Sequence, residues 1–285
     1  MKILSLLLLI LFIIRKEIII SSSINALNLW VNTLFPLLFP TFVLSDLITS
    51  SGIVNFISNK FGKFFSKIFN TNSNGLYILL ISMLCGSPSN AKNISILYKN
   101  NSINRNDITY FLIFSTLFNP FLILSFGGIK CLIIFWISNL INAYIYRPKK
   151  NKNSTQFNHT IKKFNLNDSI DININLLLKI LGVIVIFSCL INILSYNYKS
   201  RLLCSLLFEV TNSLNIIHTF FHNNLNLYLM AYSFAGLSIF IQIKSILKDT
   251  FIDFKLLVCS RCSLAFICII ISTITQCIAT LTHTL

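Results

Sequence analysis

Two carboxylates lie within or beside apolar segments of this sequence, where a charged group is costly. Asp46 ends a long apolar run, and Glu209 lies in a short amphipathic run over 202–221. A carboxylate at membrane depth is unfavourable unless it is paired or hydrated, and such residues often carry a proton or a cation. We predict that coupling role for both. The alternatives are a helix-end acid near water for Asp46, and for Glu209 an interfacial pair with Arg201 or Lys199.

The segment GSPSNAK, from Gly86 to Lys92, interrupts an apolar helical pattern. A helix that stops at this turn and restarts exposes backbone N–H groups and the positive end of its dipole, which attract anions or polar oxygens. We therefore predict that the turn lines a polar pocket. The lining candidates here are Ser87, Ser89, Asn90 and Lys92. The alternative is a plain turn made by Gly86 and Pro88, with the hydroxyl groups capping the second helix.

A similar interruption occurs in the second half of the chain. Gly86 and Gly236 are each followed, nine residues later, by the tripeptide Ser-Ile-Leu. Interrupted apolar segments at corresponding places in two halves are typical of transporter binding sites, so we predict two related halves with discontinuous or re-entrant hairpins, as inverted repeats. The other substrate-binding candidates are Asn119, Glu209, Thr211, Asn212, Ser238 and Gln242. For Asn119 the alternative is a structural role beside Pro120, because proline leaves a carbonyl without its N–H partner.

Other catalytic or metal-binding patterns are incomplete. His218 and His222 are spaced like two metal ligands on one helical face, but Thr219 stands where a metalloprotease helix has its glutamate. Cys259 and Cys262 form a C-x-x-C motif without a second pair. No phosphate-binding loop or Ser-His-Asp set can be assembled. We therefore expect no enzyme activity, no metal and no cofactor.

The composition excludes a soluble globular protein. Of the 285 residues, 55% are hydrophobic and 11% are charged, and the mean hydropathy is +0.77. Soluble domains carry about 25% charged residues. We therefore predict an all-α, polytopic integral membrane protein. The basic residues behind the net charge of +15 lie between apolar runs, where the positive-inside rule and anionic lipids explain them better than nucleic acid does.

The apolar and basic segments divide the chain into parts. The predicted parts are an uncleaved N-terminal membrane helix (1–25), a first repeat (26–146), a basic loop (147–171) and a second repeat (172–285). The positive-inside rule places the loop in the cytoplasm. Residues 53–69 predict a basic amphipathic helix at the membrane interface. Asp107 is expected to cap a span over 108–126, which Asn119-Pro120 interrupts.

Several motifs, taken in order, resemble a known family. They are LWVNTLFPLLFPTFVLSDLI (Leu29 to Ile48), GSPSNAK with the later Asn119-Pro120, EVTN (Glu209 to Asn212) and SFAGLSIFIQIKSILKDT (Ser233 to Thr250). Over most of the chain, this pattern resembles the YlbJ family of sporulation integral membrane proteins, within the nucleoside-recognition (Gate) superfamily. Two positions depart from the family pattern: Thr41 stands where an aromatic residue is usual, and Ser213 where a glycine is frequent.

The resemblance implies an inner (cytoplasmic) membrane protein of an endospore-forming bacterium, in the mother-cell or forespore membrane, needed for spore envelope and cortex formation. It carries over no nucleoside specificity. Our first hypothesis is a transporter or permeation protein for a small polar solute, surrounded by membrane lipids. The alternative is a non-transporting scaffold that recruits spore envelope proteins through the basic loop and the interfacial helix. We expect no nucleic-acid partner, and a homo-oligomer is compatible with the sequence.

Overall fold

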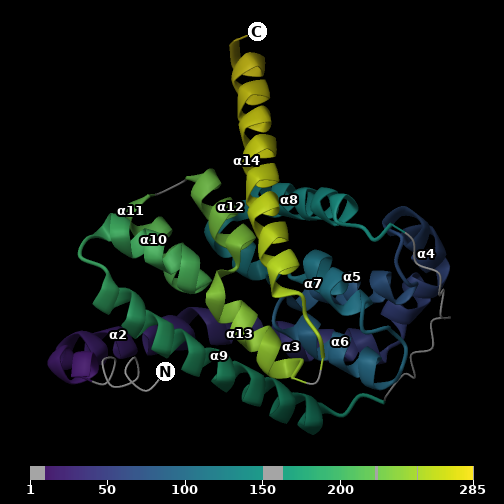
Figure 1. Ribbon diagram of the computed structural model, residues 1–285, viewed down its shortest axis with the longest axis horizontal. Coiled ribbons are helices and arrows are strands. Elements are labelled where there is room, and N and C mark those ends of the chain that lie inside the picture. The colour runs from purple at the N-terminus through teal and green to yellow at the C-terminus, as the bar shows by residue number, and fades with distance from the viewer. Residues whose placement is uncertain (1–9, 150–162, 222–223, 249, 285) are drawn as a thin grey trace.

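Every regular element in the described part of the chain is a helix. The computed structural model describes residues 10–149, 163–221, 224–248 and 250–284 (Figure 1). Part of the predicted helix over 1–25, part of the basic loop and His222 therefore lie outside the described residues. The helices are α2 (Lys16–Leu29), the π-helix η1 (Trp30–Leu34), α3 (Phe35–Ser50), α4 (Ile53–Phe69), α5 (Asn74–Cys85), α6 (Ser89–Lys99), α7 (Asp107–Ser115), α8 (Pro120–Ile145), α9 (Leu166–Leu194), α10 (Tyr198–Phe208), α11 (Val210–Phe220), α12 (Leu225–Phe234), α13 (Gly236–Ile246) and α14 (Phe254–Thr284). The all-α prediction is confirmed.

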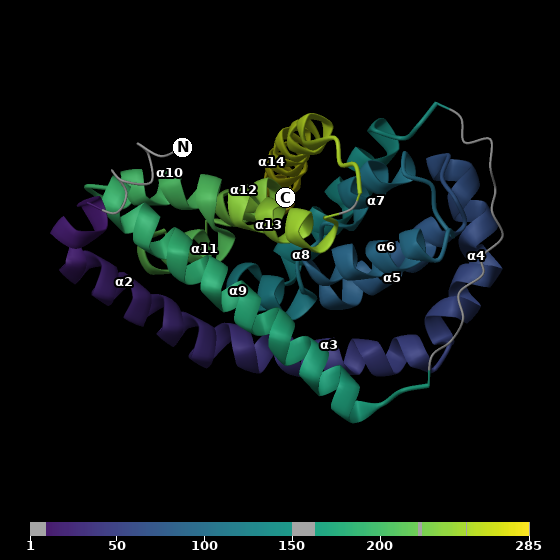
Figure 2. The same cartoon turned by 60° about the horizontal axis from the view of Figure 1, so that its bottom comes forward.

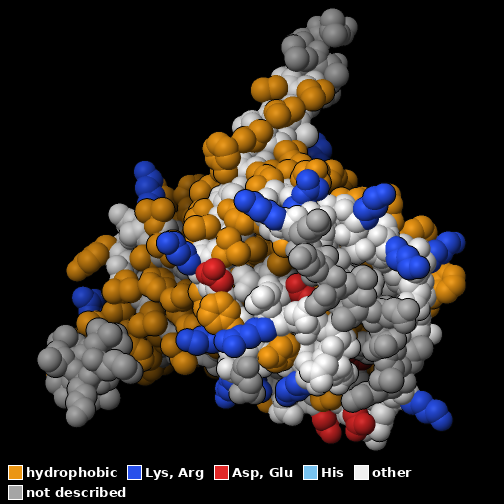
Figure 3. Space-filling view, turned by 45° about the vertical axis from the view of Figure 1, so that its right-hand side comes forward, with side chains coloured by type: hydrophobic (Ala, Val, Ile, Leu, Met, Phe, Trp, Pro, Cys, Tyr) orange, Lys and Arg blue, Asp and Glu red, His pale blue; other side chains and the backbone are white. Residues whose placement is uncertain are grey.

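Long apolar helices confirm a polytopic membrane protein. Among the described residues, five segments are long and apolar enough to cross a membrane: Lys16–Ser50, Pro120–Ile145, Leu166–Leu194, Leu225–Ile246 and Phe254–Ile278. At 1.5 Å per residue, the uninterrupted helix α9 extends over about 44 Å, which exceeds a hydrocarbon core of about 30 Å. Figure 3 shows apolar side chains gathered over one side of the body and along the projecting end of α14, with cations between them.

The first long helical segment runs antiparallel to α9. Ser22 of α2 accepts a hydrogen bond from Asn192, near the end of α9, at 2.9 Å. Asp46, near the end of α3, contacts Ser169 and Asn173 at the start of α9. The two helices therefore lie against each other over most of their length, as Figure 2 shows. This pair holds Leu34, Leu38, Ile180 and Ile184 beside the interrupted helices described below.

The structure confirms one predicted interruption and corrects two predicted boundaries. The span predicted over 108–126 is divided at the Asn119-Pro120 interruption, since α7 ends at Ser115 and α8 begins at Pro120. A residue before proline avoids the helical region, and Asn119 has φ −53° and ψ 130°. Asp107 does not cap α7, because Asn106 holds the cap position and makes no side-chain cap bond there. The amphipathic run over 202–221 is two helices, divided at the extended residue Glu209 (φ −153°, ψ 120°).

The predicted amphipathic helix over 53–69 is confirmed as α4. Its buried face includes Val54, Phe65 and Phe69, while Lys60 and Phe64 are exposed. A face that exposes both cations and large aromatic side chains is typical of a helix in the membrane interface. That location for α4 remains a prediction.

Candidate functional site

Four helix breaks in the described part of the chain contact each other in two pairs. In the first pair, the turn Gly86–Pro88 between α5 and α6 packs against residues 116–119 between α7 and α8, and Ser87 N donates to Leu117 O at 2.7 Å. In the second pair, Gly236 at the start of α13 packs against Glu209 between α10 and α11. Each pair joins two interrupted helices through their backbones.

Glycine makes both close approaches possible. Gly86 and Gly236 have φ values of +75° and +73°, in the left-handed region that favours glycine. A Cβ atom on Gly86 would lie 2.4 Å from Asn119 N, and one on Gly236 would lie 3.1 Å from Glu209 N. The two glycines that match in the sequence therefore have the same local role, each beside a residue that caps another helix.

The order of these breaks differs between the two halves. Gly86 precedes its capping partner Asn119 along the chain, whereas Gly236 follows its partner Glu209. A duplication in tandem would keep the same order in both halves. The glycine match is thus explained by local packing, and the internal repeat remains a prediction.

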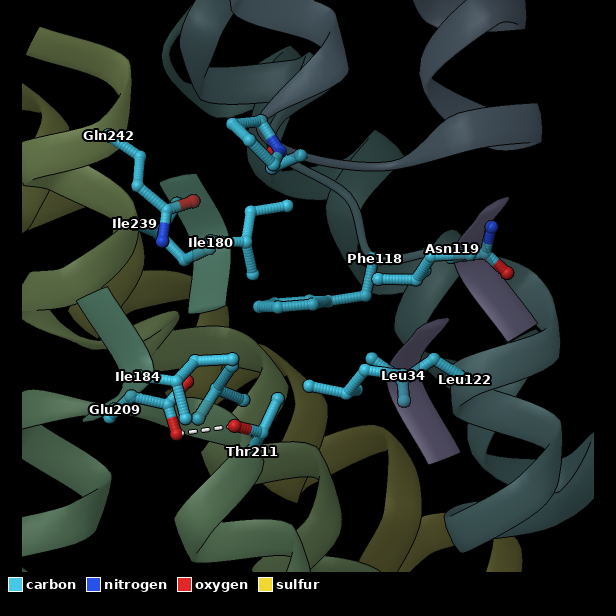
Figure 4. A pocket seen from close by; sticks show the side chains of 14 residues that line it. Leu34, Phe118, Asn119, Leu122, Ile180, Ile184, Glu209, Thr211, Ile239 and Gln242 are labelled. Carbon is cyan, nitrogen blue, oxygen red and sulfur yellow. Dashed lines mark hydrogen bonds between the residues drawn. The ribbon is translucent and has the colours of Figure 1, made fainter. Parts of the chain in front are cut away.

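The two pairs of breaks enclose one pocket (Figure 4). Its lining combines polar residues with apolar ones: Ser87, Asn119, Glu209, Thr211 and Gln242 with Leu34, Leu38, Pro88, Phe118, Leu122, Ile180, Ile184, Val210 and Ile239. The empty space between these side chains is about 430 Å³, and the part open to the centre of a water molecule is about 30 Å³. The second volume is enough for about one or two water molecules. Five predicted site residues, from both halves of the chain, thus share one small cavity.

Glu209 is the carboxylate of this pocket and also the N-cap of α11. Its side chain is buried, with 2% exposed. Glu209 Oε2 accepts hydrogen bonds from Asn212 N at 2.7 Å and from Thr211 Oγ1 at 2.5 Å. No ion pair involves Glu209 among the described residues, so the alternative of an interfacial pair with Arg201 or Lys199 does not describe this arrangement. The helix N-terminus stabilises negative charge at this position.

Two further polar atoms at the pocket have no hydrogen-bond partner among the described residues. They are Ser87 Oγ, in the turn between α5 and α6, and Gln242 Oε1, on α13. Both atoms are buried. Leaving a buried polar group unpaired costs about 1–3 kcal/mol. Figure 4 shows the Gln242 amide directed toward the space above Glu209. These atoms are available to water or to a polar solute.

Asn119 lines the pocket, but both polar atoms of its side chain form hydrogen bonds with other protein groups. Its Oδ1 accepts from Phe121 N at 2.9 Å, which caps α8, and its Nδ2 donates to Thr41 Oγ1 at 2.7 Å. In Figure 4 the amide is turned away from Glu209 and Gln242. These bonds favour a structural role for Asn119 over contact with a solute. The backbone carbonyl that Pro120 leaves without an N–H donor is not among its partners.

The other predicted residues lie outside the lining. They are Ser89, Asn90, Lys92, Asn212, Ser238 and Asp46. Asn90 Nδ2 donates to Ser115 Oγ at 3.0 Å, and Asn212 Nδ2 donates to Ser188 Oγ at 2.7 Å. Ser238 is fully buried, and its Oγ has no partner among the described residues.

Asp46 belongs to a separate polar cluster between α3, α6 and α9. Its Oδ2 accepts from Ser169 Oγ at 2.8 Å and from Asn173 Nδ2 at 2.9 Å. Its Oδ1 lies 3.9 Å from Lys92 Nζ, and about a third of the Asp46 side chain is exposed. The two predicted coupling carboxylates are therefore not neighbours, and Asp46 holds helices together near the surface.

Arg261 is a buried cation that the sequence analysis did not select. It is 1% exposed on α14, and its Nη2 donates to Thr116 O at 2.8 Å, at the break between α7 and α8. Its Nε and Nη1 have no partner among the described residues. A single arginine inside an apolar span is a detectable signal, since charges there are rare and usually serve a purpose.

Comparisons with known proteins give one similarity. No family model matches the chain, and no solved structure matches it. The chain is 32% identical over 108 residues to the "Sporulation integral membrane protein YlbJ" of Bacillus subtilis (strain 168), which covers 38% of this chain. The match spans 26% of that protein, about a quarter of its length. It confirms the resemblance to YlbJ for this share of the chain and supports a YlbJ-like family, while the wider extent that the motifs indicate stays a prediction.

Proposed function

We propose that this YlbJ-like, multi-span membrane protein acts in sporulation, and that it moves a small polar solute through the pocket between the four helix breaks. The observation that carries this proposal is the convergence of both pairs of breaks on one cavity with a buried carboxylate, Glu209. The named relative is a sporulation protein by its own name, and that role comes to this chain as part of the proposal. The cytoplasmic membrane of an endospore-forming bacterium is the location that fits it.

Irregular backbone inside a membrane protein supports a passage for polar solutes. Non-helical segments at membrane depth are tolerated where protein buries them or where they line a cavity. Here the lining includes two buried polar atoms, Ser87 Oγ and Gln242 Oε1, that have no partner among the described residues. A scaffold gains nothing from such groups, whereas a solute or water would bond them. We further propose that the interrupted helices form re-entrant hairpins, as in other transporters.

The size of the cavity indicates which state this structure represents. A volume of about 30 Å³ has room for water but not for a solute the size of a sugar or an amino acid. Solute passage then requires the pair at Gly86 to separate from the pair at Gly236. In our proposal, the narrow pocket described here is one state of such a cycle.

Glu209 is the residue that we propose for proton or cation coupling. It is the buried acid among the polar residues of the lining, and its Oε2 is fixed by Thr211 and Asn212. A carboxylate that gains or loses a charge at this depth changes the energy of the pocket by several kcal/mol. Asp46, on the surface cluster with Lys92, serves in our proposal as a tie between helices that move.

Complementation of a deletion strain tests the proposal. The test alleles are Glu209→Gln and Ser87→Ala/Gln242→Leu, and the matched control is Ser89→Ala, since Ser89 lies two residues from Ser87 and outside the lining. Loss of a buried polar contact costs about 1–3 kcal/mol, so heat-resistant spores should fall about tenfold to a hundredfold with the test alleles alone. Membrane abundance must be equal for all. Full sporulation by both test alleles would overturn transport through this pocket and favour the scaffold.

A further inference from the structure

The helices α2, α9 and α10 meet at one end of the molecule (Figure 2). A second cavity lies there. The part of this cavity that is open to the centre of a water molecule is about 400 Å³, compared with about 30 Å³ in the pocket at the helix breaks. Two arginines, Arg15 and Arg201, line it together with three serines and two asparagines. No acidic residue is among its described lining residues. This cavity shares no lining residue with the first pocket.

The charges around this cavity are unbalanced. Among the described residues, the ion pair present joins Asp46 and Lys92. Neither Arg15 nor Arg201 forms one within the described part of the chain. The acid nearest in the sequence, Glu17, is exposed on α2 and does not line the cavity. Lys16 and Lys199 add positive charge beside it. A cavity with these charges favours an anion over a cation or a neutral solute.

Among anions, a phosphate group fits these two arginines and their polar neighbours best. A guanidinium group has a planar fork of donors that matches phosphate oxygens in a bidentate way. The three serine hydroxyls of the lining already donate to helix carbonyls, those of Ser21 and Ser22 to Ile18 O and that of Ser195 to Ile191 O. The amide groups of Asn25 and Asn192 therefore supply the further donors to a phosphate oxygen. Asn192 and Ser22 are already joined at 2.9 Å, so the polar wall is in place without a ligand.

The location supports the same chemistry. The helix α9 is a candidate span, and its start adjoins the basic loop while its end adjoins the cavity, so the two lie at opposite ends of this span. The end of a span lies near the lipid headgroups, where phosphate groups are concentrated and attract Lys and Arg. Exposed Ile14, Ile20 and Leu194 stand next to lining residues in the sequence, where acyl chains would lie.

We propose that this cavity binds a phosphate group, with Arg15 and Arg201 as its charge partners. The group belongs either to an anionic phospholipid headgroup or to a free phosphate compound. The inference goes beyond the proposed transport function and does not depend on it, because it uses neither Glu209 nor the helix breaks.

Thermal unfolding of the full chain in an uncharged detergent tests the site. The probes are short-chain phosphatidylglycerol and inorganic phosphate, and the references are short-chain phosphatidylcholine and sodium chloride at equal ionic strength. The variant Arg15→Gln/Arg201→Gln is compared with Lys16→Gln/Lys199→Gln, which removes the same charge from the same end of the molecule but not from the lining. We expect saturable stabilisation of the wild type, weakened about thirtyfold by the arginine pair and less than about threefold by the lysine pair.

The two probes distinguish the sources of the phosphate. Stabilisation by phosphatidylglycerol alone identifies a lipid headgroup site, and stabilisation by inorganic phosphate at similar concentrations identifies a site for free phosphate compounds. Equal weakening by the two double variants, or no saturable stabilisation of the wild type by either probe, overturns the proposal. If the Arg15→Gln/Arg201→Gln variant does not fold, Arg15→Lys/Arg201→Lys takes its place. The lysines keep the positive charge but lack the planar fork of guanidinium donors, so we expect binding about tenfold weaker than that of the wild type.

Discussion

At the scale of single residues, Glu209 combines two roles that substitutions can separate. Its carboxylate caps α11 by accepting from Asn212 N, and the same group is the buried acid of the pocket. Glutamine keeps an oxygen that can accept the cap bond but cannot ionise. Alanine removes both functions. The pair of variants therefore distinguishes a structural glutamate from a functional one.

We predict that Glu209→Gln keeps the stability of the fold and that Glu209→Ala lowers it. Loss of a helix cap costs about 1 kcal/mol, or about 2–4 °C in the unfolding midpoint of a chain this size. Unfolding of both purified variants in detergent, followed by tryptophan fluorescence, measures the difference. Sporulation should fail with both variants, because ionisation of Glu209 is lost in each. A stable Glu209→Gln protein that sporulates normally would reduce the residue to a cap.

At the scale of elements, the positions of the breaks follow from a few residues. Gly86, Pro88, Pro120 and Gly236 predict interruptions because they cannot continue a helix or because they allow positive φ. The break at Glu209 has neither glycine nor proline beside it. It arises because the side chain caps the following helix and the backbone becomes extended. Local sequence rules therefore identified three of these four breaks.

The lining of the pocket could be predicted only in part. Ser87 lies in the turn itself and faces the pocket, whereas Asn90 and Lys92 lie on α6, where each residue is rotated by about 100° from the last and faces other neighbours. The apolar lining from Leu34 and Ile184 depends on tertiary packing of distant helices. No pattern within one segment contains that information.

We predict a gradient of stability among alanine substitutions of the positive-φ glycines. Gly128 has φ +70° and open space around its would-be Cβ, so Gly128→Ala costs only the backbone strain of about 1–3 kcal/mol. Gly236→Ala adds a 3.1 Å contact with backbone, and Gly86→Ala adds one of 2.4 Å. The unfolding midpoint should fall least for Gly128, more for Gly236 and most for Gly86. A loss for Gly86→Ala no greater than that for Gly128→Ala would contradict the packing of the first pair of breaks.

At the scale of the whole molecule, the positive-inside rule orients the antiparallel pair of spans. The basic loop precedes α9, and the residues after its end, including the 93% exposed Tyr196, lie at the other end of that span. The loop should face the cytoplasm. The second cavity, beside Arg201, would then face outward.

Reporter fusions test this orientation. We predict that alkaline phosphatase is active when fused after Tyr196 and inactive when fused after Lys149, because the enzyme matures only outside the cytoplasm. A β-galactosidase series at the same two positions should give the opposite pattern. Phosphatase activity at Lys149 with none at Tyr196 would invert the molecule in the membrane and reverse the assignment of the two faces.

Transport through the pocket between the four helix breaks requires that the pocket opens to water during function. Chemical labelling of Ser87→Cys, compared with Ser82→Cys in the closely packed interior of α5, measures that opening. Mass spectrometry of the labelled peptide separates the introduced thiol from the native cysteines. A small water-soluble thiol reagent, applied to membranes from sporulating cells, should modify position 87 at least about tenfold faster than position 82, because only an accessible thiolate reacts. Equal protection of both positions, with equal abundance of both proteins, would contradict an opening pocket.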